Sequence, residues 1–82
     1  MNVLIIGTGY VGLISGLCLS LKHNVTCVDI NQNLIDKLNS GKPHIYEDGL
    51  KEMLEEQISS GKFKCINLKD INLSKVEIVI FC

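Results

Sequence analysis

Near its N-terminus the chain reads Val3-Leu4-Ile5-Ile6-Gly7-Thr8-Gly9-Tyr10-Val11-Gly12, a short apolar run that breaks into a glycine-spaced turn. Four apolar residues bounded by glycine predict a parallel strand that is buried on both faces. The three glycines have the spacing G-x-G-x-x-G, and a helical pattern follows them directly. A strand, a glycine-rich turn and a helix in this order are typical of a dinucleotide-binding unit.

Each glycine of this turn has its own expected role. Gly7 allows a tight turn out of the strand, Gly9 has no side chain to block a pyrophosphate, and Gly12 lets the helix lie close to the sheet. The start of the helix offers unpaired N–H groups and the positive end of its dipole to the phosphates. The spacing alone would also suit an ordinary turn with spare glycines, so the surrounding sequence has to distinguish the two.

An acidic residue at the end of the next strand supports the dinucleotide interpretation. Residues 24–29 predict that strand, and Asp29 stands at its carboxyl end. Its carboxylate can accept hydrogen bonds from both ribose hydroxyls of adenosine, and its charge repels a 2′-phosphate, which favours NAD over NADP. The alternative role for Asp29 is to cap the next helix. Asn31 can perform that capping, which would leave Asp29 free.

The first helix is expected to span residues 10–22. Its apolar stripe is expected to contain Val11, Ile14, Cys18 and Leu21. Gly16 lies on the same side as Gly12 and would help the helix approach the sheet. It could equally be a tolerated flaw that costs about 1 kcal/mol relative to alanine.

The remaining chain predicts two helices and two more strands. Residues 31–40 form a helix that Gly41 ends, and Asp48 caps a second helix after the loop 42–47. The core face of the second helix is expected to contain Leu50, Met53, Leu54 and Ile58. Strands are expected at 63–67 and 76–82, with a short helical turn at 69–75 between them.

These elements predict an α/β fold of the Rossmann-like type. Right-handed crossovers between parallel strands give a partial doubly wound sheet of about four strands in the order 3-2-1-4. Residues 1–82 would then be the N-terminal part of an NAD-binding domain, because a whole domain of this type has six strands. The last strand lies at the sheet edge and has few charges, so we expect self-association or pairing with a missing remainder.

Composition excludes several classes of function. The formal net charge is −1, and the eight basic residues are all scattered lysines, which argues against binding to nucleic acid. Glycines interrupt the apolar N-terminus and no basic segment precedes it, which argues against a signal peptide or a membrane span. No Cys/His cluster suggests a metal site. We expect the four cysteines to be small buried residues of a cytoplasmic protein, and His23 to be a solvated turn residue. The cysteines are Cys18, Cys27, Cys65 and Cys82.

Three segments resemble the N-terminus of the UDP-glucose/GDP-mannose dehydrogenase family: residues 7–13 (GTGYVGL), Val28-Asp29, and residues 45–50 (IYEDGL). The resemblance covers all 82 residues but only the beginning of the family pattern. It implies NAD-dependent oxidation of the C6 hydroxyl of a nucleotide sugar to a carboxylate, with UDP-glucose to UDP-glucuronate as the expected reaction. The expected cofactor-binding residues are Gly7, Gly9, Tyr10, Val11, Gly12 and Asp29. Tyr10 and Val11 would contact the cofactor through their backbone or would simply pack.

The family's catalytic residues cannot be placed on this chain. Cys82 follows the last strand with no activating partner in sight, so it is not taken for the family's nucleophile. The UDP-sugar is therefore expected as a partner of a longer protein only, while NAD is the expected partner of this chain. Family members often carry a lysine or arginine where this chain has Leu34. The chain also departs from the family pattern in having His44 before Ile45 and Asp48 after Glu47. The alternative function is a nucleotide-sensing regulatory module of Rossmann type.

Overall fold

The four strands form a single parallel sheet in the order β3-β2-β1-β4. The computed structural model describes all residues from 1 to 82. Its strands are β1 (Asn2–Ile6), β2 (Asn24–Asp29), β3 (Phe63–Asn67) and β4 (Ile78–Phe81). Its helices are α1 (Tyr10–Ser20), α2 (Gln32–Asn39), α3 (Leu50–Ser59) and the short 3-10 turn η1 (Leu68–Asp70). The predicted fold class and strand order are confirmed.

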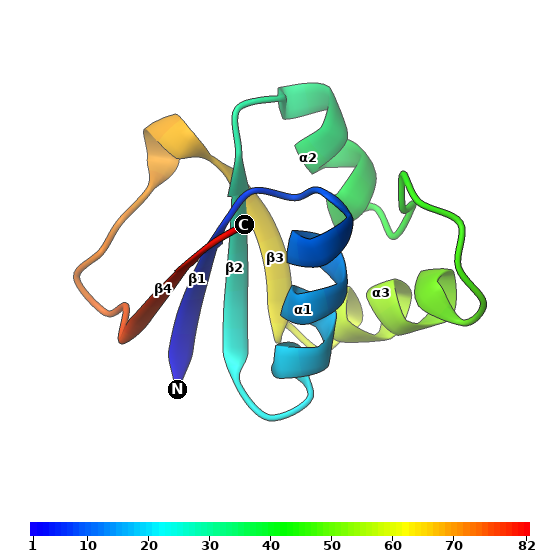
Figure 1. Ribbon diagram of the computed structural model, residues 1–82, viewed down its shortest axis with the longest axis horizontal. Coiled ribbons are helices and arrows are strands. Elements are labelled where there is room, and N and C mark those ends of the chain that lie inside the picture. Colours follow the sequence, from blue (N-terminus) through cyan, green and yellow to red (C-terminus); the bar gives the residue numbers. More distant parts are fainter.

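The helices gather on one side of the sheet, and the connection from η1 to β4 runs along the other side (Figure 1). The core lies between the sheet and the helices, because alternate strand residues point toward them. From the strands it contains Val3, Ile5, Val25, Cys27, Phe63 and Cys65. From the helices it contains Leu13, Leu17, Ile35, Leu38, Leu50 and Leu54. None of the helices has the length and apolar character needed to cross a membrane.

The predicted buried face of α1 is wrong. Val11 is 67% exposed, and Cys18 and Leu21 are exposed as well, while only Ile14 packs in part against the core. The residues that α1 buries are Gly12, Leu13, Gly16, Leu17 and Ser20. Nearly every side chain of this helix is apolar, so apolar spacing could not select the face.

Glycine selects that face. A Cβ at Gly16 would lie 2.9 Å from Cε1 of Phe63 and 3.1 Å from Sγ of Cys27. The absence of a side chain therefore lets α1 lie directly against β2 and β3. Gly16 is a close-packing position and not a tolerated flaw.

The ends of α2 agree with the sequence, but the start of α3 does not. The Leu34 N–H donates to Oδ1 of Asn31 at 3.1 Å, and Gly41 follows α2 with a φ of +83°. The residue that precedes α3 is Gly49, at φ +80°, and no side chain caps this helix. A backbone turn takes over, because the Leu50 N–H donates to the Glu47 carbonyl at 3.1 Å. Asp48 is therefore exposed and does not cap.

The core face of α3 is confirmed, and the last strand is shorter than expected. Leu50 and Leu54 are buried, and Met53 and Ile58 pack against the core.

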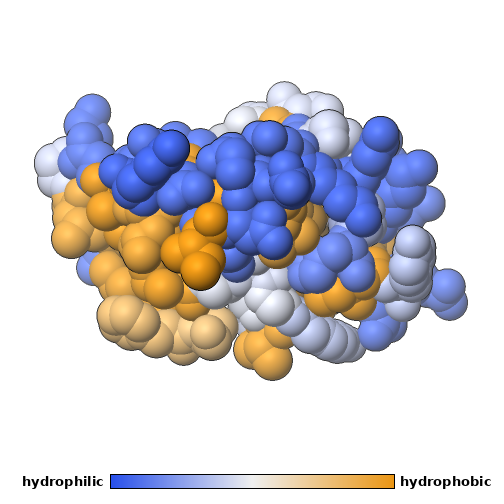
Figure 2. Space-filling view, turned by 90° about the horizontal axis from the view of Figure 1, so that it is seen from above, coloured by the Kyte–Doolittle hydropathy of each residue, from blue (hydrophilic) through white to orange (hydrophobic).

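Strand β4 covers 78–81, and its side chains Ile78, Val79 and Phe81 are exposed. The helical turn after β3 is limited to η1. Seen from above, apolar residues gather on the left of the molecule, the side on which β4 lies (Figures 1 and 2).

The cysteines divide into two groups. Cys27 and Cys65 are buried neighbours on β2 and β3, as expected, but Cys18 and Cys82 are exposed, so the expectation of four buried thiols is wrong. The hydrogen bond with Cys65, followed by burial, raises the pKa of the Cys27 thiol and keeps it protonated. His23 is half-buried with its Nδ1 enclosed and without a partner, so it is not the solvated residue that the sequence suggested.

Candidate functional site

The glycine turn lies where the carboxyl ends of β1, β2 and β4 meet the start of α1 (Figure 1). Gly7 has a φ of +109°, and its N–H donates to the Val28 carbonyl at 2.8 Å. A Cβ at Gly7 would lie 2.6 Å from the Cys82 carbonyl oxygen. Only glycine suits both the left-handed backbone and this close approach. The turn is thus fixed between two neighbouring strands.

The other two glycines of the turn have opposite surroundings. A Cβ at Gly12 would overlap the Gly7 carbonyl oxygen, whereas a Cβ at Gly9 would meet nothing within 4 Å. Gly9 therefore faces open space at the helix start. The first helical hydrogen bond runs from the Leu13 N–H to the Gly9 carbonyl at 2.9 Å, so the N–H groups of residues 10–12 come before the helical ladder. Free N–H groups at an uncovered helix start fit a diphosphate.

Asp29 is held in place by residues of the same chain. Its Oδ2 accepts a hydrogen bond from the Thr8 hydroxyl at 2.5 Å, and its Oδ1 accepts from the N–H groups of Ile30 at 2.8 Å and Asn31 at 3.0 Å. The expectation that Asn31 caps α2 and spares Asp29 that role is confirmed, because the Leu34 N–H donates to Oδ1 of Asn31, whereas the N–H groups that donate to Asp29 precede the helix. Oδ2 carries one of these hydrogen bonds and keeps acceptor capacity for a ligand hydroxyl.

Thr8 is the site residue that sequence reasoning missed. It occupies the first variable position of the G-x-G motif and is almost fully buried. Its hydroxyl joins the glycine turn to the end of β2, which are 21 residues apart in sequence. The available signal was a hydroxyl residue placed between two glycines, opposite an acid.

A small hollow of about 180 Å³ opens beside the carboxylate of Asp29. Four of its six lining residues are apolar: Ile6, Val28, Ile30 and Leu68, which join Gly7 and Asp29. An apolar hollow beside a fixed acceptor suits a flat ring that is attached to a sugar. Gly7 lines the hollow and also begins the turn that leads to the open helix start, so both lie at the same end of the sheet.

The side chains of Tyr10 and Val11 are exposed and do not pack into the core. The Tyr10 hydroxyl donates to Oε1 of Glu47 at 2.9 Å, and Val11 projects into solvent. The hydrogen bond to Glu47, followed by its negative charge, raises the pKa of Tyr10. This contact joins the start of α1 to the loop that precedes α3.

The carboxylate of Asp29 makes stability depend on pH in a defined direction. Burial raises the pKa of Asp29, but hydrogen bonds from the Thr8 hydroxyl and from the N–H groups of Asn31, Ile30 and Thr8 outweigh it and hold the pKa below its ordinary value of 3.8. Below that ordinary value the unfolded chain binds a proton that the folded chain does not, so stability falls as the pH falls through the lowered pKa.

We expect Asp29→Asn to remove the contribution of this carboxylate to the pH dependence of stability. Urea unfolding between about pH 6 and about pH 3 should show a smaller loss of stability for the variant than for the parent chain. Asp36→Asn, on the exposed side of α2, serves as the matched control and should keep the parent's pH dependence. If the free energy of unfolding of Asp29→Asn changed with pH as steeply as that of the parent chain, the expectation would be contradicted.

A sequence model described as the NAD binding domain of the UDP-glucose/GDP-mannose dehydrogenase family matches residues 1–82. UDP-glucose 6-dehydrogenase of Bacillus subtilis is 38% identical over 80 residues, which are 96% of this chain and 18% of that protein. GDP-mannose 6-dehydrogenase of Pseudomonas savastanoi is 46% identical over 65 residues, which are 78% of this chain and 15% of that protein. The chain thus spans less than a fifth of the length of these relatives.

Solved structures of similar enzymes have the same fold over this segment. A ternary complex of GDP-mannose dehydrogenase from Pseudomonas aeruginosa superposes with a TM-score of 0.91 at 31% identity, covering 100% of this chain and 19% of that one. UDP-glucose dehydrogenase from Pyrobaculum islandicum gives 0.88 at 29% identity, covering 99% of this chain and 19% of that one. A strand, glycine turn and acid of dinucleotide-binding type thus occur in a chain that matches a dehydrogenase family from end to end. The chain belongs to the UDP-glucose/GDP-mannose dehydrogenase family, within its NAD-binding domain, and its cofactor is NAD.

Proposed function

We propose that this chain binds the ADP part of NAD for an enzyme that oxidises the C6 hydroxyl of a UDP-sugar, with UDP-glucose going to UDP-glucuronate. The observation that carries the proposal is the Asp29 carboxylate, which Thr8 and two N–H groups hold beside the open glycine turn. NAD supplies the hydride acceptor when it is bound. The chain's own residues bind and orient the adenosine end.

In this proposal the pyrophosphate lies at the start of α1. Gly9 leaves room for it, because nothing stands within 4 Å of the position that its Cβ would take. The N–H groups of Tyr10, Val11 and Gly12 are the hydrogen-bond donors, and the helix dipole adds a favourable field. Gly7 and Gly12 act indirectly by keeping the turn compact. The side chains of Tyr10 and Val11 have no part in holding the phosphates.

The adenosine occupies the hollow beside Asp29. Its ribose hydroxyls donate to the carboxylate, and its adenine lies against the apolar residues of the hollow. The negative charge of Asp29 would repel a 2′-phosphate, so NAD is preferred to NADP. Leu34 supplies no charge near this end of α2, which leaves the cofactor without one cationic contact that family members often have.

The longest of the sequence matches support UDP-glucose as the proposed substrate. The UDP-glucose 6-dehydrogenases of Bacillus subtilis and Rickettsia felis match over 96% of the chain, whereas the GDP-mannose 6-dehydrogenase of Pseudomonas savastanoi matches over 78%. The family match also favours a dehydrogenase over a nucleotide-sensing regulatory module. We place the sugar nucleotide in the longer protein, in a cytoplasmic setting, and expect the 82-residue chain to bind the cofactor without oxidising a sugar.

Binding of ADP-ribose tests the assigned site. Isothermal titration with the 82-residue chain should show that Asp29→Ala weakens binding about tenfold, since hydrogen bonds to a charged acceptor are lost. Gly9→Val should weaken it at least as much, because the branched side chain would fill the space kept for the phosphates. Asp36→Ala, which removes the same charge from the exposed side of α2, is the control and should bind like the parent. Unchanged titration curves for both Asp29→Ala and Gly9→Val would refute the assignment of this site to the cofactor.

A further inference from the structure

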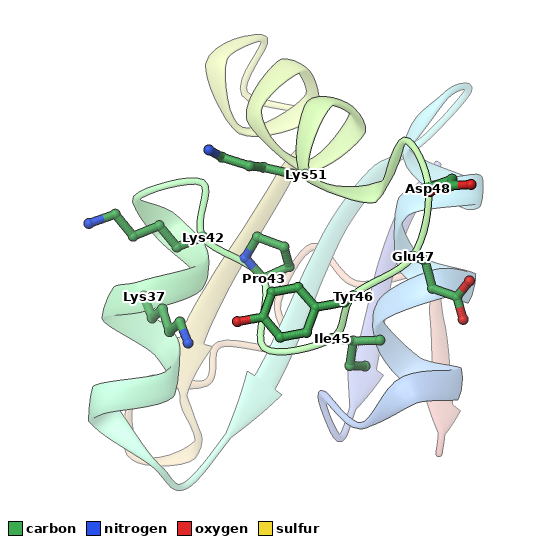
Figure 3. Close-up of a pocket in the computed structure, with 8 residues that line it drawn as sticks. All are labelled: Lys37, Lys42, Pro43, Ile45, Tyr46, Glu47, Asp48 and Lys51. Carbon is green, nitrogen blue, oxygen red and sulfur yellow. The ribbon is translucent and has the colours of Figure 1, made fainter.

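A second and larger cleft, of about 540 Å³, lies between the end of α2 and the start of α3 (Figure 3). Its floor and sides come from the loop that joins the two helices, residues 42–49. It shares no lining residue with the hollow beside Asp29. Its volume falls within the range of small-ligand pockets. The proposed binding of NAD does not use it.

Three lysines line this cleft without any partner in the protein. Lys37 comes from the last turn of α2, Lys42 from the loop and Lys51 from the first turn of α3. None of their ammonium groups makes a hydrogen bond or an ion pair in the structure. Figure 3 shows all three on the same side of the cleft. Three unpaired cations on one side of a hollow attract an anion.

The end of α2 does not need these lysines. Its last carbonyls accept from the N–H groups of Ser40, Gly41 and Lys42, at 3.0 to 3.2 Å. The Ser40 hydroxyl adds bonds to the carbonyls of residues 36 and 37 at 3.0 and 2.8 Å. Backbone groups and one hydroxyl thus satisfy the helix end. The ammonium groups remain available to a ligand.

An aromatic ring stands beside the lysines. Tyr46 is 93% exposed, and Figure 3 shows its ring extending toward the side of the cleft that carries Lys37 and Lys42. A large aromatic side chain left in water beside cations offers a stacking surface for a planar ring. Pro43 and Ile45 add apolar surface around it. The cleft therefore combines a stacking surface with a cationic end.

The acidic residues of the loop do not neutralise that end. Glu47 accepts the hydrogen bond from the Tyr10 hydroxyl at 2.9 Å, and its side chain points away from the lysines (Figure 3). The Asp48 side chain lies on the same far side (Figure 3). The acidic side chains and the lysines thus lie on opposite sides of the cleft. The hydrogen bond from Tyr10 holds Glu47 on the acidic side.

We propose that this cleft is a second nucleotide site, which takes a diphosphate attached to a planar ring. Lys37, Lys42 and Lys51 hold the phosphates, and the ring stacks on Tyr46. Free nucleoside diphosphates and nucleotide sugars share this chemistry. Occupancy of the cleft is independent of the Asp29 site.

Titration of the 82-residue chain with UDP tests the proposal, and inorganic pyrophosphate is the comparison probe. The double variant Lys37→Gln/Lys42→Gln should weaken UDP binding about tenfold, since two charge-assisted contacts are lost. Lys22→Gln/Lys62→Gln removes the same charge from exposed positions elsewhere and should leave UDP binding unchanged. Tyr46→Ala should weaken binding, whereas Tyr46→Phe should retain it because the ring remains.

Independence from the Asp29 site is measured in the same assay. Asp29→Ala should bind UDP like the parent chain, and saturating UDP should leave ADP-ribose binding unchanged. Displacement of ADP-ribose by UDP would overturn the second site while leaving the proposed NAD site intact. Equal affinity for pyrophosphate and UDP would overturn the role of Tyr46. If neither Lys37→Gln/Lys42→Gln nor Tyr46→Ala weakened UDP binding, the assignment of the cleft as the UDP site would be overturned. Titration with UDP-glucose, compared with UDP, identifies whether the cleft prefers a nucleotide sugar or a free nucleoside diphosphate.

Discussion

Gly12→Ala is expected to destabilise the fold by about 3 kcal/mol, because overpacking at a rigid position costs of this order. The added Cβ would overlap the Gly7 carbonyl oxygen, which is backbone and cannot rotate away. Gly7 is itself held by its hydrogen bond to Val28 and by the close Cys82 carbonyl, so the turn has no direction in which to yield. Urea unfolding followed by circular dichroism measures the loss.

Gly9→Ala is the matched control, from the same turn and with the same added atom. Its Cβ would meet nothing within 4 Å, so stability should stay within about 0.5 kcal/mol of the parent. The two variants separate the structural glycine from the glycine that faces the ligand. Equal stability of Gly12→Ala and Gly9→Ala would show that the turn can relax and would contradict the packing account.

Phe63→Ala is expected to cost about 4 kcal/mol, in the range for truncating a buried phenylalanine. Phe63 is 1% exposed, and its ring lies against the glycine face of α1 beside Gly16. Removing the ring would open a cavity at the contact between α1 and the sheet. A domain of this size has only a few kcal/mol of stability, so the variant should be largely unfolded at 25 °C by circular dichroism.

Phe81 provides the control, because the chain has two phenylalanines and Phe81 is 80% exposed on β4. Phe81→Ala should keep the parent's stability within about 0.5 kcal/mol. It should also reduce self-association, since Ile78, Val79 and Phe81 form an exposed apolar strand at the sheet edge. Sedimentation at high micromolar concentration measures this. A parent chain that is monomeric there, or a Phe63→Ala chain as stable as Phe81→Ala, would contradict these expectations.

The sheet was predictable because its signals are local. Each strand is a short apolar run between turn residues, and right-handed crossovers then leave one order, which the structure confirms. Phe63–Asn67 is predicted to the residue. The buried face of α1 was not predictable from apolar spacing, because Val11, Cys18 and Leu21 are as apolar as the residues that pack. The glycine pair 12 and 16 held the information, since only the sheet-facing side requires the absence of side chains.

At the candidate site, the positions of the glycines and of Asp29 followed from the motif, but their connection did not. The hydrogen bond between Thr8 and Asp29 joins two separate turns, and no spacing rule places a hydroxyl against an acid 21 residues away. The start of α3 shows the same limit. Asp48 has a good capping side chain, but the left-handed turn at Gly49 gives the task to backbone groups.

The central position of β1 has a consequence for how the chain folds during synthesis. Of the four strands β1 is made before the others, yet its partners are β2 and the much later β4, beside which Glu77 bonds to Asn2. The glycine turn gains its second wall only when Cys82 has emerged. Until then β1 is paired with β2 alone, and its other edge has no partner. Folding on the ribosome is therefore expected to finish late, in a single closing step set by these long-range contacts.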